Sequence, residues 1–119
     1  MSDSILRIRS KEFAKDIILF CRKLKKNAVE GTLINQLLRC ATSVGANIYE
    51  AQYAQGTKDF ISKLEIALKE CNESGYWLEL LFETNSISEV EFKTFQKKCI
   101  ELRRMLVSSI TTLKNNSGF

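Results

Sequence analysis

Residues 37–81 read LLRCATSVGANIYEAQYAQGTKDFISKLEIALKECNESGYWLELL, and this stretch decides the fold. Apolar residues recur every three to four positions on both sides of Gly56, which predicts two long helices that meet at this glycine. In the first of these helices, polar side chains stand among apolar ones on the face that should be buried. Each buried polar group needs a partner, so we expect pairing with a neighbouring helix. The polar residues are Arg39, Asn47 and Glu50.

The same periodicity predicts one further helix on each side of this pair. The four expected helices cover about residues 10–26, 32–54, 58–83 and 89–114. The chain has 119 residues and no proline, so long helices can run without a break. Four amphipathic helices joined by short turns predict a single all-α domain over residues 1–119, an antiparallel up-and-down four-helix bundle.

Each expected helix carries one apolar stripe. The third and fourth helices repeat it as a heptad, which predicts near-parallel packing. The stripes are Phe13, Ile17, Phe20, Cys21 and Leu24, extended by Ile5 and Ile8; Ile34, Leu37, Leu38, Ala41, Val44, Ile48 and Ala51; Phe60, Leu64, Ala67, Cys71, Ser74, Leu78 and Leu81; and Phe92, Phe95, Cys99, Leu102, Leu106, Ser109 and Leu113.

The turns have their own signals. We expect Gly31 to take a positive φ in the first turn and Thr57 to cap the third helix. Ser88 and Glu91 have the spacing of a capping box at the start of the fourth helix.

Several apolar residues lie off the four stripes, and leftover apolar surface on a small bundle favours self-association. We therefore expect a homo-oligomer, the alternative being ordinary partial exposure on a monomer. These residues are Ile18, Ile61, Ile66, Trp77, Phe82, Ile100 and Val107.

Pairing across the second and third helices follows from the turn at Gly56. In an antiparallel pair centred there, facing residues have numbers that add up to roughly 112, which predicts an ion pair between Arg39 and Glu73. Glu50 reaches Lys63 by the same rule. We expect Asn47 to hydrogen-bond a neighbouring helix or subunit, so that all four polar residues, Arg39, Asn47, Glu50 and Glu73, are structural.

The four cysteines, Cys21, Cys40, Cys71 and Cys99, fall one in each helix. We interpret them as reduced thiols packed in the core, because each lies on or beside an apolar face. A four-cysteine zinc site is the alternative, although the short ligand spacings of such sites are absent.

The amino-acid composition argues against catalysis. The chain has no histidine, which removes the commonest general base and metal ligand. Its isolated glycines form no phosphate-binding loop. We therefore expect no enzyme activity, no catalytic residue, no metal, no cofactor and no small-molecule substrate. Neither a membrane-spanning run nor a signal peptide stands out, so we expect no membrane partner and a cytoplasmic location.

Positive charge is concentrated at the start of the chain. Residues 1–28 hold eight basic and three acidic residues, a net charge of +5, whereas the remainder holds ten basic and eleven acidic residues. A phosphate backbone is one partner that such a surface fits, and a solvated helix face is the alternative. The candidate nucleic-acid-binding residues are Arg7, Arg9, Lys11, Lys15, Arg22, Lys23, Lys25 and Lys26.

Residues 36–51, QLLRCATSVGANIYEA, resemble the signature of the bacterial four-helix bundle family named for 23S rRNA intervening-sequence proteins, the S23 ribosomal protein type. Residues 60–64, FISKL, and the segment from Ala67 to Leu78 are similar to its third-helix signature. The resemblance implies a closed bundle that assembles into a ring-like homopentamer. A related branch, the accessory variability proteins of diversity-generating retroelements, binds nucleic acid through a basic surface and works with a reverse transcriptase.

Two hypotheses of function follow. The first is an oligomeric, non-enzymatic scaffold or accessory protein that binds RNA or DNA weakly and without sequence preference. No aromatic pattern interleaved with these charges supports base stacking, so the sequence predicts no sequence-specific readout. The second is a protein-interaction or structural module with no nucleic-acid role, which the nearly neutral remainder of the chain favours.

Overall fold

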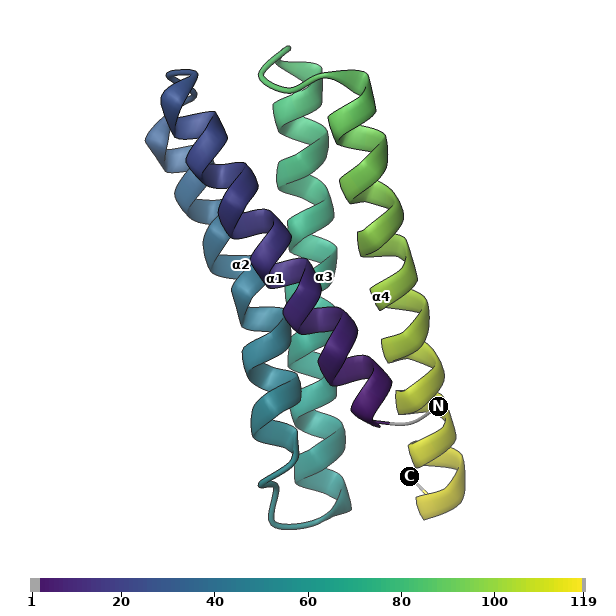
Figure 1. Cartoon of the computed structure of the whole chain (residues 1–119). Helices are drawn as coiled ribbons and strands as arrows, with labels where there is room; N and C mark the ends of the chain where they lie inside the picture. The colour runs from purple at the N-terminus through teal and green to yellow at the C-terminus, as the bar shows by residue number, and fades with distance from the viewer. Residues whose placement is uncertain (1–2, 119) are drawn as a thin grey trace.

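The computed structural model describes residues 3–118 and consists of four helices joined by short turns. They are α1 (Asp3–Lys26), α2 (Gly31–Ala51), α3 (Thr57–Glu83) and α4 (Glu89–Ser117). Successive helices run in opposite directions, which confirms the all-α four-helix bundle (Figure 1). None of these helices has the length and hydropathy that crossing a membrane requires within the described residues.

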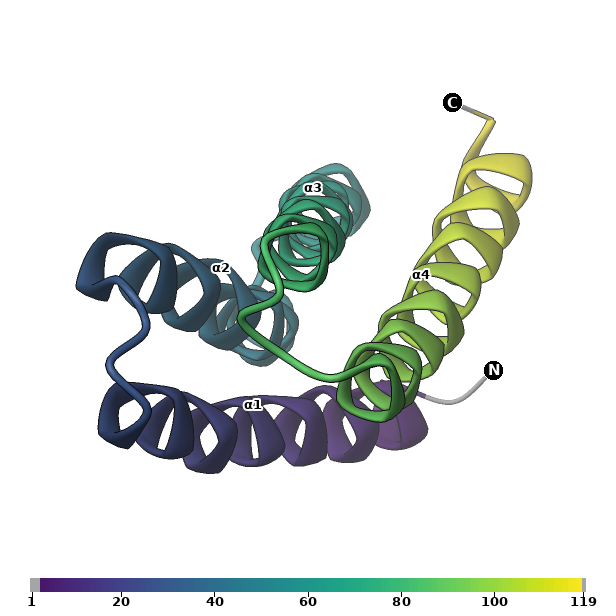
Figure 2. The same cartoon turned by 90° about the horizontal axis from the view of Figure 1, so that it is seen from above.

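The helices are not equally aligned. α2 packs against α3, and α3 packs less extensively against α4, which diverges from it toward the C-terminus (Figures 1 and 2). α1 crosses the side of this layer at an angle, packed on α2, and its side chains from Arg9 to Lys23 reach α4 (Figures 1 and 2). α1 therefore makes its main contacts with α2 and fewer with α4.

The expected stripes form the core. Nearly all of their residues are buried, and the two phenylalanine pairs Phe20–Phe95 and Phe82–Phe92 stack with ring centroids 4.5 and 4.6 Å apart. Leu38, Phe60, Phe92 and Leu113 are half-buried against this core. The heptads of α3 and α4 thus mark the buried face from end to end.

The expected extension of the first stripe is wrong. Ile5 and Ile8 are exposed, while Leu6 and Ser10 are buried in their place. Leu6 lies seven residues before Phe13, so it continues the helical stripe in phase. Ser10 is buried because its hydroxyl donates to the carbonyl of Arg7, 3.2 Å away, which satisfies a polar group within the helix.

Several residues expected off the core belong to it. Ile61 is buried, and Trp77 and Phe82 pack half-buried against the core. They therefore need no second subunit to account for them. Ile66, Ile100 and Val107 remain exposed, and Ile18 is half-buried.

Two turn expectations also differ from the structure. In the first turn Ala28, not Gly31, takes the positive φ, of 60°, and Gly31 already begins α2. At the second turn Gly56 is the N-cap of α3 in extended backbone, and Thr57 is the first helical residue without a capping bond. Asp59, in the first turn of α3, accepts from the backbone N–H of Gln55, 3.2 Å away, and so ties the preceding turn to the start of the helix.

Three helix ends lie away from the expected positions. α1 begins at Asp3 rather than near residue 10, and α4 continues to Ser117, ending at Gly118 with φ 72°. α2 ends at Ala51, three residues earlier than expected. The capping box at the start of α4 is confirmed. Glu91 N–H donates to Ser88 Oγ at 3.0 Å, and Ser88 N–H donates to Glu91 Oε1 at 2.9 Å.

Replacing Ser88 by Ala removes the acceptor for the Glu91 N–H. We expect a loss of about 1 kcal/mol in the free energy of unfolding, the usual size for an N-cap serine. Urea denaturation followed by circular dichroism measures it. Ser108→Ala, an exposed serine inside α4, is the control and should change little. Equal losses in the two variants would contradict a capping role.

Candidate functional site

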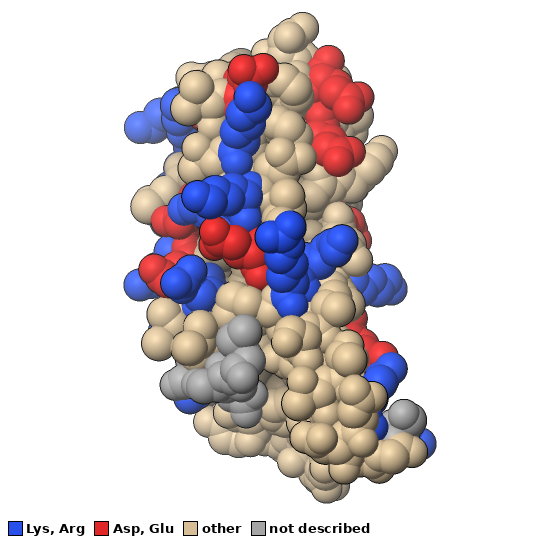
Figure 3. All heavy atoms as spheres, turned by 90° about the vertical axis from the view of Figure 1, so that its right-hand side faces the viewer, with Lys and Arg blue, Asp and Glu red and all other residues tan. Residues whose placement is uncertain are grey.

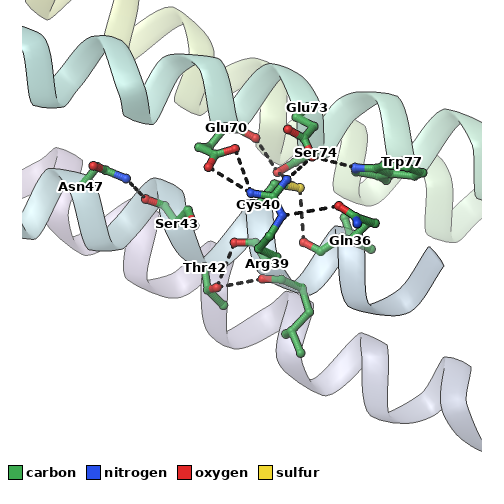
Figure 4. Close-up of polar contacts among 12 residues, drawn as sticks. Gln36, Arg39, Cys40, Thr42, Ser43, Asn47, Glu70, Glu73, Ser74 and Trp77 are labelled. Atoms are coloured by element: carbon green, nitrogen blue, oxygen red, sulfur yellow. Dashed lines mark hydrogen bonds and ion pairs between the residues drawn. The ribbon is translucent and has the colours of Figure 1, made fainter. Parts of the chain in front are cut away.

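A cluster of polar side chains spans the interface between α2 and α3 (Figure 4). Arg39 of α2 donates from Nη2 to Glu73 Oε2 and from Nη1 to Glu70 Oε2 at 3.2 Å. Its Nε donates to Gln36 Oε1 at 3.4 Å. The expected Arg39–Glu73 pair is confirmed, and Glu70 is a second acidic partner that the sequence reading missed.

This cluster lies at the rim of the helix interface rather than inside it. The Arg39 side chain is 47% exposed, while Glu70 and Glu73 are 15% and 32% exposed. The expectation that Arg39 stands on a buried face is therefore wrong. Its guanidinium covers the seam from outside, which leaves the charged head in water.

Glu73 has a second donor. Trp77 Nε1, one turn further along α3, donates to Glu73 Oε2 at 3.0 Å. This hydrogen bond and the Arg39 guanidinium hold the pKa of Glu73 below its ordinary value. The carboxylate thus fixes the half-buried indole and the guanidinium at the same time.

A thiol and a hydroxyl lie beneath the cluster. Ser74 is fully buried, and its hydroxyl lies 3.2 Å from Cys40 Sγ and donates to the Glu70 carbonyl at 2.9 Å. Burial raises the pKa of the Cys40 thiol. The seam therefore changes from charged at the rim to neutral in the core, as close packing of two helices requires.

The predictions for the two remaining polar residues of α2 have different outcomes. Glu50 accepts from Lys63 Nζ at 3.1 Å, as the register predicts, but its side chain is 59% exposed. Asn47 is half-buried and donates from Nδ2 to the Ser43 carbonyl of its own helix at 2.8 Å. The expected bond from Asn47 to a neighbouring helix is wrong within this chain, because the amide has an acceptor one turn back.

The arrangement offers structural support to the interface between α2 and α3. Among the side chains of residues 5–118, no group of three or more His, Cys, Asp or Glu residues lies close enough to hold a metal ion. Every buried side-chain nitrogen or oxygen in that range has a hydrogen-bond partner. We interpret the cluster as a clamp that holds α2 and α3 in register.

The four cysteines are side chains of the core. All four are free and buried. Burial raises the pKa of Cys21 to about 11, and contact with Cys71 together with burial raises the pKa of Cys99. Cys71 donates to the Cys99 carbonyl at 3.4 Å and Cys21 to the Ile34 carbonyl at 3.9 Å. The thiols act as small core side chains.

The basic residues of α1 divide into two sets. The first set faces α4, where Arg9 lies 3.7 Å from Glu101 and Lys23 lies 2.6 Å from Glu91. Lys98 of α4 adds a third pair with Asp16, at 2.6 Å. Acidic and basic side chains accordingly lie beside one another on the α4 side of the molecule (Figure 3). These charges attach α1 to α4 and produce no patch of one sign.

The second set points away from α4. Its members are exposed and have no ion pair among the described side chains: Lys11, Lys15, Arg22, Lys25 and Lys26. Arg7 is exposed on the same part of α1. At 100° per residue these positions share one flank of the helix, whereas Arg9 and Lys23 lie on the opposite flank. One flank of α1 therefore carries basic side chains that have no acidic partner among the described side chains. Counting charges in the sequence did not distinguish these residues from Arg9 and Lys23.

Sequence reasoning missed two exposed aromatic residues next to this flank. Tyr49 is 61% exposed and Tyr53 is 71% exposed, and their rings lie 5.5 Å apart. Tyr49 lines a groove between α1 and α2 together with Arg7 and Lys11. The signal was the four-residue spacing of the two tyrosines, which places Tyr53, just beyond the end of α2, beside Tyr49.

Comparison with known proteins agrees with this architecture. The family model of the 23S rRNA-intervening sequence protein matches residues 3–108. Among solved structures, a protein of unknown function from the S23 ribosomal protein family of Bacteroides thetaiotaomicron VPI-5482 is 41% identical in sequence. The match has a TM-score of 0.90 and covers 93% of this chain and 99% of that one. No curated protein matches the chain.

The Glu73 clamp predicts a pH dependence. Its carboxyl pKa is lower in the folded protein than in the unfolded chain, so its stabilisation is present at neutral pH and is lost as the pH falls through the folded value. Glu73→Gln should lower the melting temperature at pH 7, and the difference from the wild type should vanish well below pH 4.5, its ordinary value. Glu79→Gln, an exposed position of α3, is the control. A difference independent of pH would contradict the charge-based role.

The buried thiols predict slow chemistry. At pH 8 a thiol reagent should react with the native protein only slowly, over hours, because all four thiols are buried and the raised pKa of Cys21 further suppresses its own thiolate. In denaturant all four should react at once. With a reagent that releases a coloured thiolate, the absorbance gives the number of thiols that have reacted. Rapid labelling of the native protein would contradict the prediction and show that the core opens readily.

Proposed function

Because the chain belongs to the family of 23S rRNA-intervening sequence proteins, we propose that it is a non-enzymatic helical accessory protein that binds nucleic acid weakly through α1. The observation that carries this proposal is the exposed basic flank of α1. Five of its lysine and arginine side chains have no acidic partner among the described residues. Each can neutralise a phosphate and release counterions, which favours binding without sequence preference.

The division of charges supports this assignment. Arg9 and Lys23 already form ion pairs with carboxylates of α4, so these two candidates contribute less to a phosphate-binding surface. The remaining basic side chains lie along one flank from Lys11 to Lys26, a rise of about 22 Å at 1.5 Å per residue. A continuous track of this length fits an extended phosphate backbone better than a small anion.

We also propose that the protein acts as a homo-oligomer in the cytoplasm, a pentamer by family resemblance. Ile66, Ile100 and Val107 of α3 and α4 are 40 to 43% exposed and are available to a second copy. Repeating a weak basic surface around a ring multiplies contacts with one strand through avidity. Four free thiols suit a reducing compartment. Light scattering that finds a monomer at micromolar concentration would remove this part of the proposal.

Charge reversal tests the binding surface. The triple variant K15E/R22E/K26E should lower affinity for a generic RNA or DNA duplex more than tenfold in low salt. It should also reduce the slope of log affinity against log salt by about 3, one unit for each lost phosphate contact. Fluorescence anisotropy with a labelled oligonucleotide measures both quantities.

The matched control is K58E/K97E/R104E. It makes the same change in net charge at exposed residues of α3 and α4 that have no ion pair in the described part of the chain. Equal losses in the two triple variants would show that net charge alone, and not the α1 flank, governs binding. Lys23 is left unchanged because a glutamate there would repel Glu91 and disturb the fold.

A further inference from the structure

The groove between α1 and α2 brings aromatic and basic side chains together. It has a volume of about 540 Å³ and is lined by Arg7, Ile8, Ser10, Lys11, Ala14, Gly45 and Tyr49. The two helices approach closely at its floor, where a Cβ on Gly45 would lie 3.5 Å from the Ser10 carbonyl oxygen. The close approach leaves a shallow channel whose described lining holds two cations and no acidic side chain.

Two tyrosines stand at one end of this groove. Tyr49 and Tyr53 are four residues apart, at and just beyond the end of α2, with ring centroids 5.5 Å apart and planes tilted by 49°. Both are more than 60% exposed, so large apolar ring faces remain in water. The bundle does not need these rings for its core, because Val44, Ile48 and Ala51 fill the buried side of the same helix. Exposed pairs of this kind are typical of binding surfaces.

The basic flank begins at the tyrosines. Arg7 and Lys11 line the groove beside Tyr49, and Lys15, Arg22 and Lys25 continue the charge along α1. The acidic residues nearest in sequence are turned to other partners, since Glu12 lies beside Arg9 and Glu50 accepts from Lys63. An anionic chain that follows α1 therefore reaches two exposed rings at one end of its path.

We propose that this surface binds single-stranded nucleic acid, with bases stacked on Tyr49 and Tyr53 and phosphates on the basic flank of α1. The inference rests on the proposed function and specifies its substrate. Duplex bases are already stacked on one another and offer no free face to a tyrosine, whereas a single strand offers every base. Stacking uses ring faces that all bases share, so it needs no sequence readout.

The test compares one strand with its duplex. Anisotropy at low salt measures the affinity of the full chain for a labelled single strand, as RNA and as DNA, and for the matching duplex. The double variant Tyr49→Leu/Tyr53→Leu should weaken binding of the single strand about tenfold or more and leave duplex binding unchanged. Tyr49→Phe/Tyr53→Phe keeps the rings and should bind as the wild type does.

Two controls separate the possible outcomes. Tyr76→Leu removes an exposed tyrosine of α3, away from the groove, and should have no effect. If the wild type binds neither single strand nor duplex, the proposed function itself fails. If it binds both and the leucine variant keeps full affinity for the single strand, only the stacking inference fails. A change of oligomeric state in the leucine variant, seen by light scattering, would show that a second copy covers the tyrosines and would also overturn the inference.

Discussion

The close approach of α2 to its two neighbours is the constraint on which the rest of the structure depends. Small residues make it feasible: Ala41 and Ala51 are buried, and Gly45 lies against the backbone of α1 at Ser10. At Gly45 no side chain separates α2 from α1, so the two backbones come close together at this point. Longer polar side chains of α2 are then displaced to the rims, where Arg39 reaches over α3 and Tyr49 borders α1. The clamp at Arg39 and the groove beside Tyr49 thus both follow from the close approach of α2 to its neighbours.

The parts of the fold that follow from helical phase and register could be read from the sequence. Arg39 with Glu73 and Glu50 with Lys63 follow from one antiparallel turn, and both pairs are present. Phase was misjudged where a polar residue occupies the core. Ser10 satisfies its hydroxyl within its own helix, so its burial leaves no apolar signal and the stripe seemed to pass through Ile8. The turn at Ala28 was missed for a related reason, because only the backbone there shows which residue takes the positive φ.

The candidate binding surface was less visible in the sequence than the fold. Eight basic residues near the start of the chain looked equivalent, and only the placement of α4 reveals that Arg9 and Lys23 face carboxylates. Likewise, Tyr49 and Tyr53 are distant in sequence from Arg7 and Lys11 and meet them only once α1 lies across α2. Local patterns specify each helix, whereas a surface shared by two helices depends on how they pack. The same folding step that neutralises one flank of α1 leaves the other available.

The order of packing along the chain has a kinetic consequence. Each helix makes its main contacts with the helix next to it in sequence, and α1 meets α4 through a smaller interface closed by ion pairs. Most native contacts therefore close short loops, and low contact order is associated with folding in microseconds to milliseconds. The absence of proline also removes the slow isomerisation that delays many chains. On the ribosome, α1 and α2 can pair as a hairpin before α4 is made, and the basic flank of α1 then forms ahead of the finished bundle.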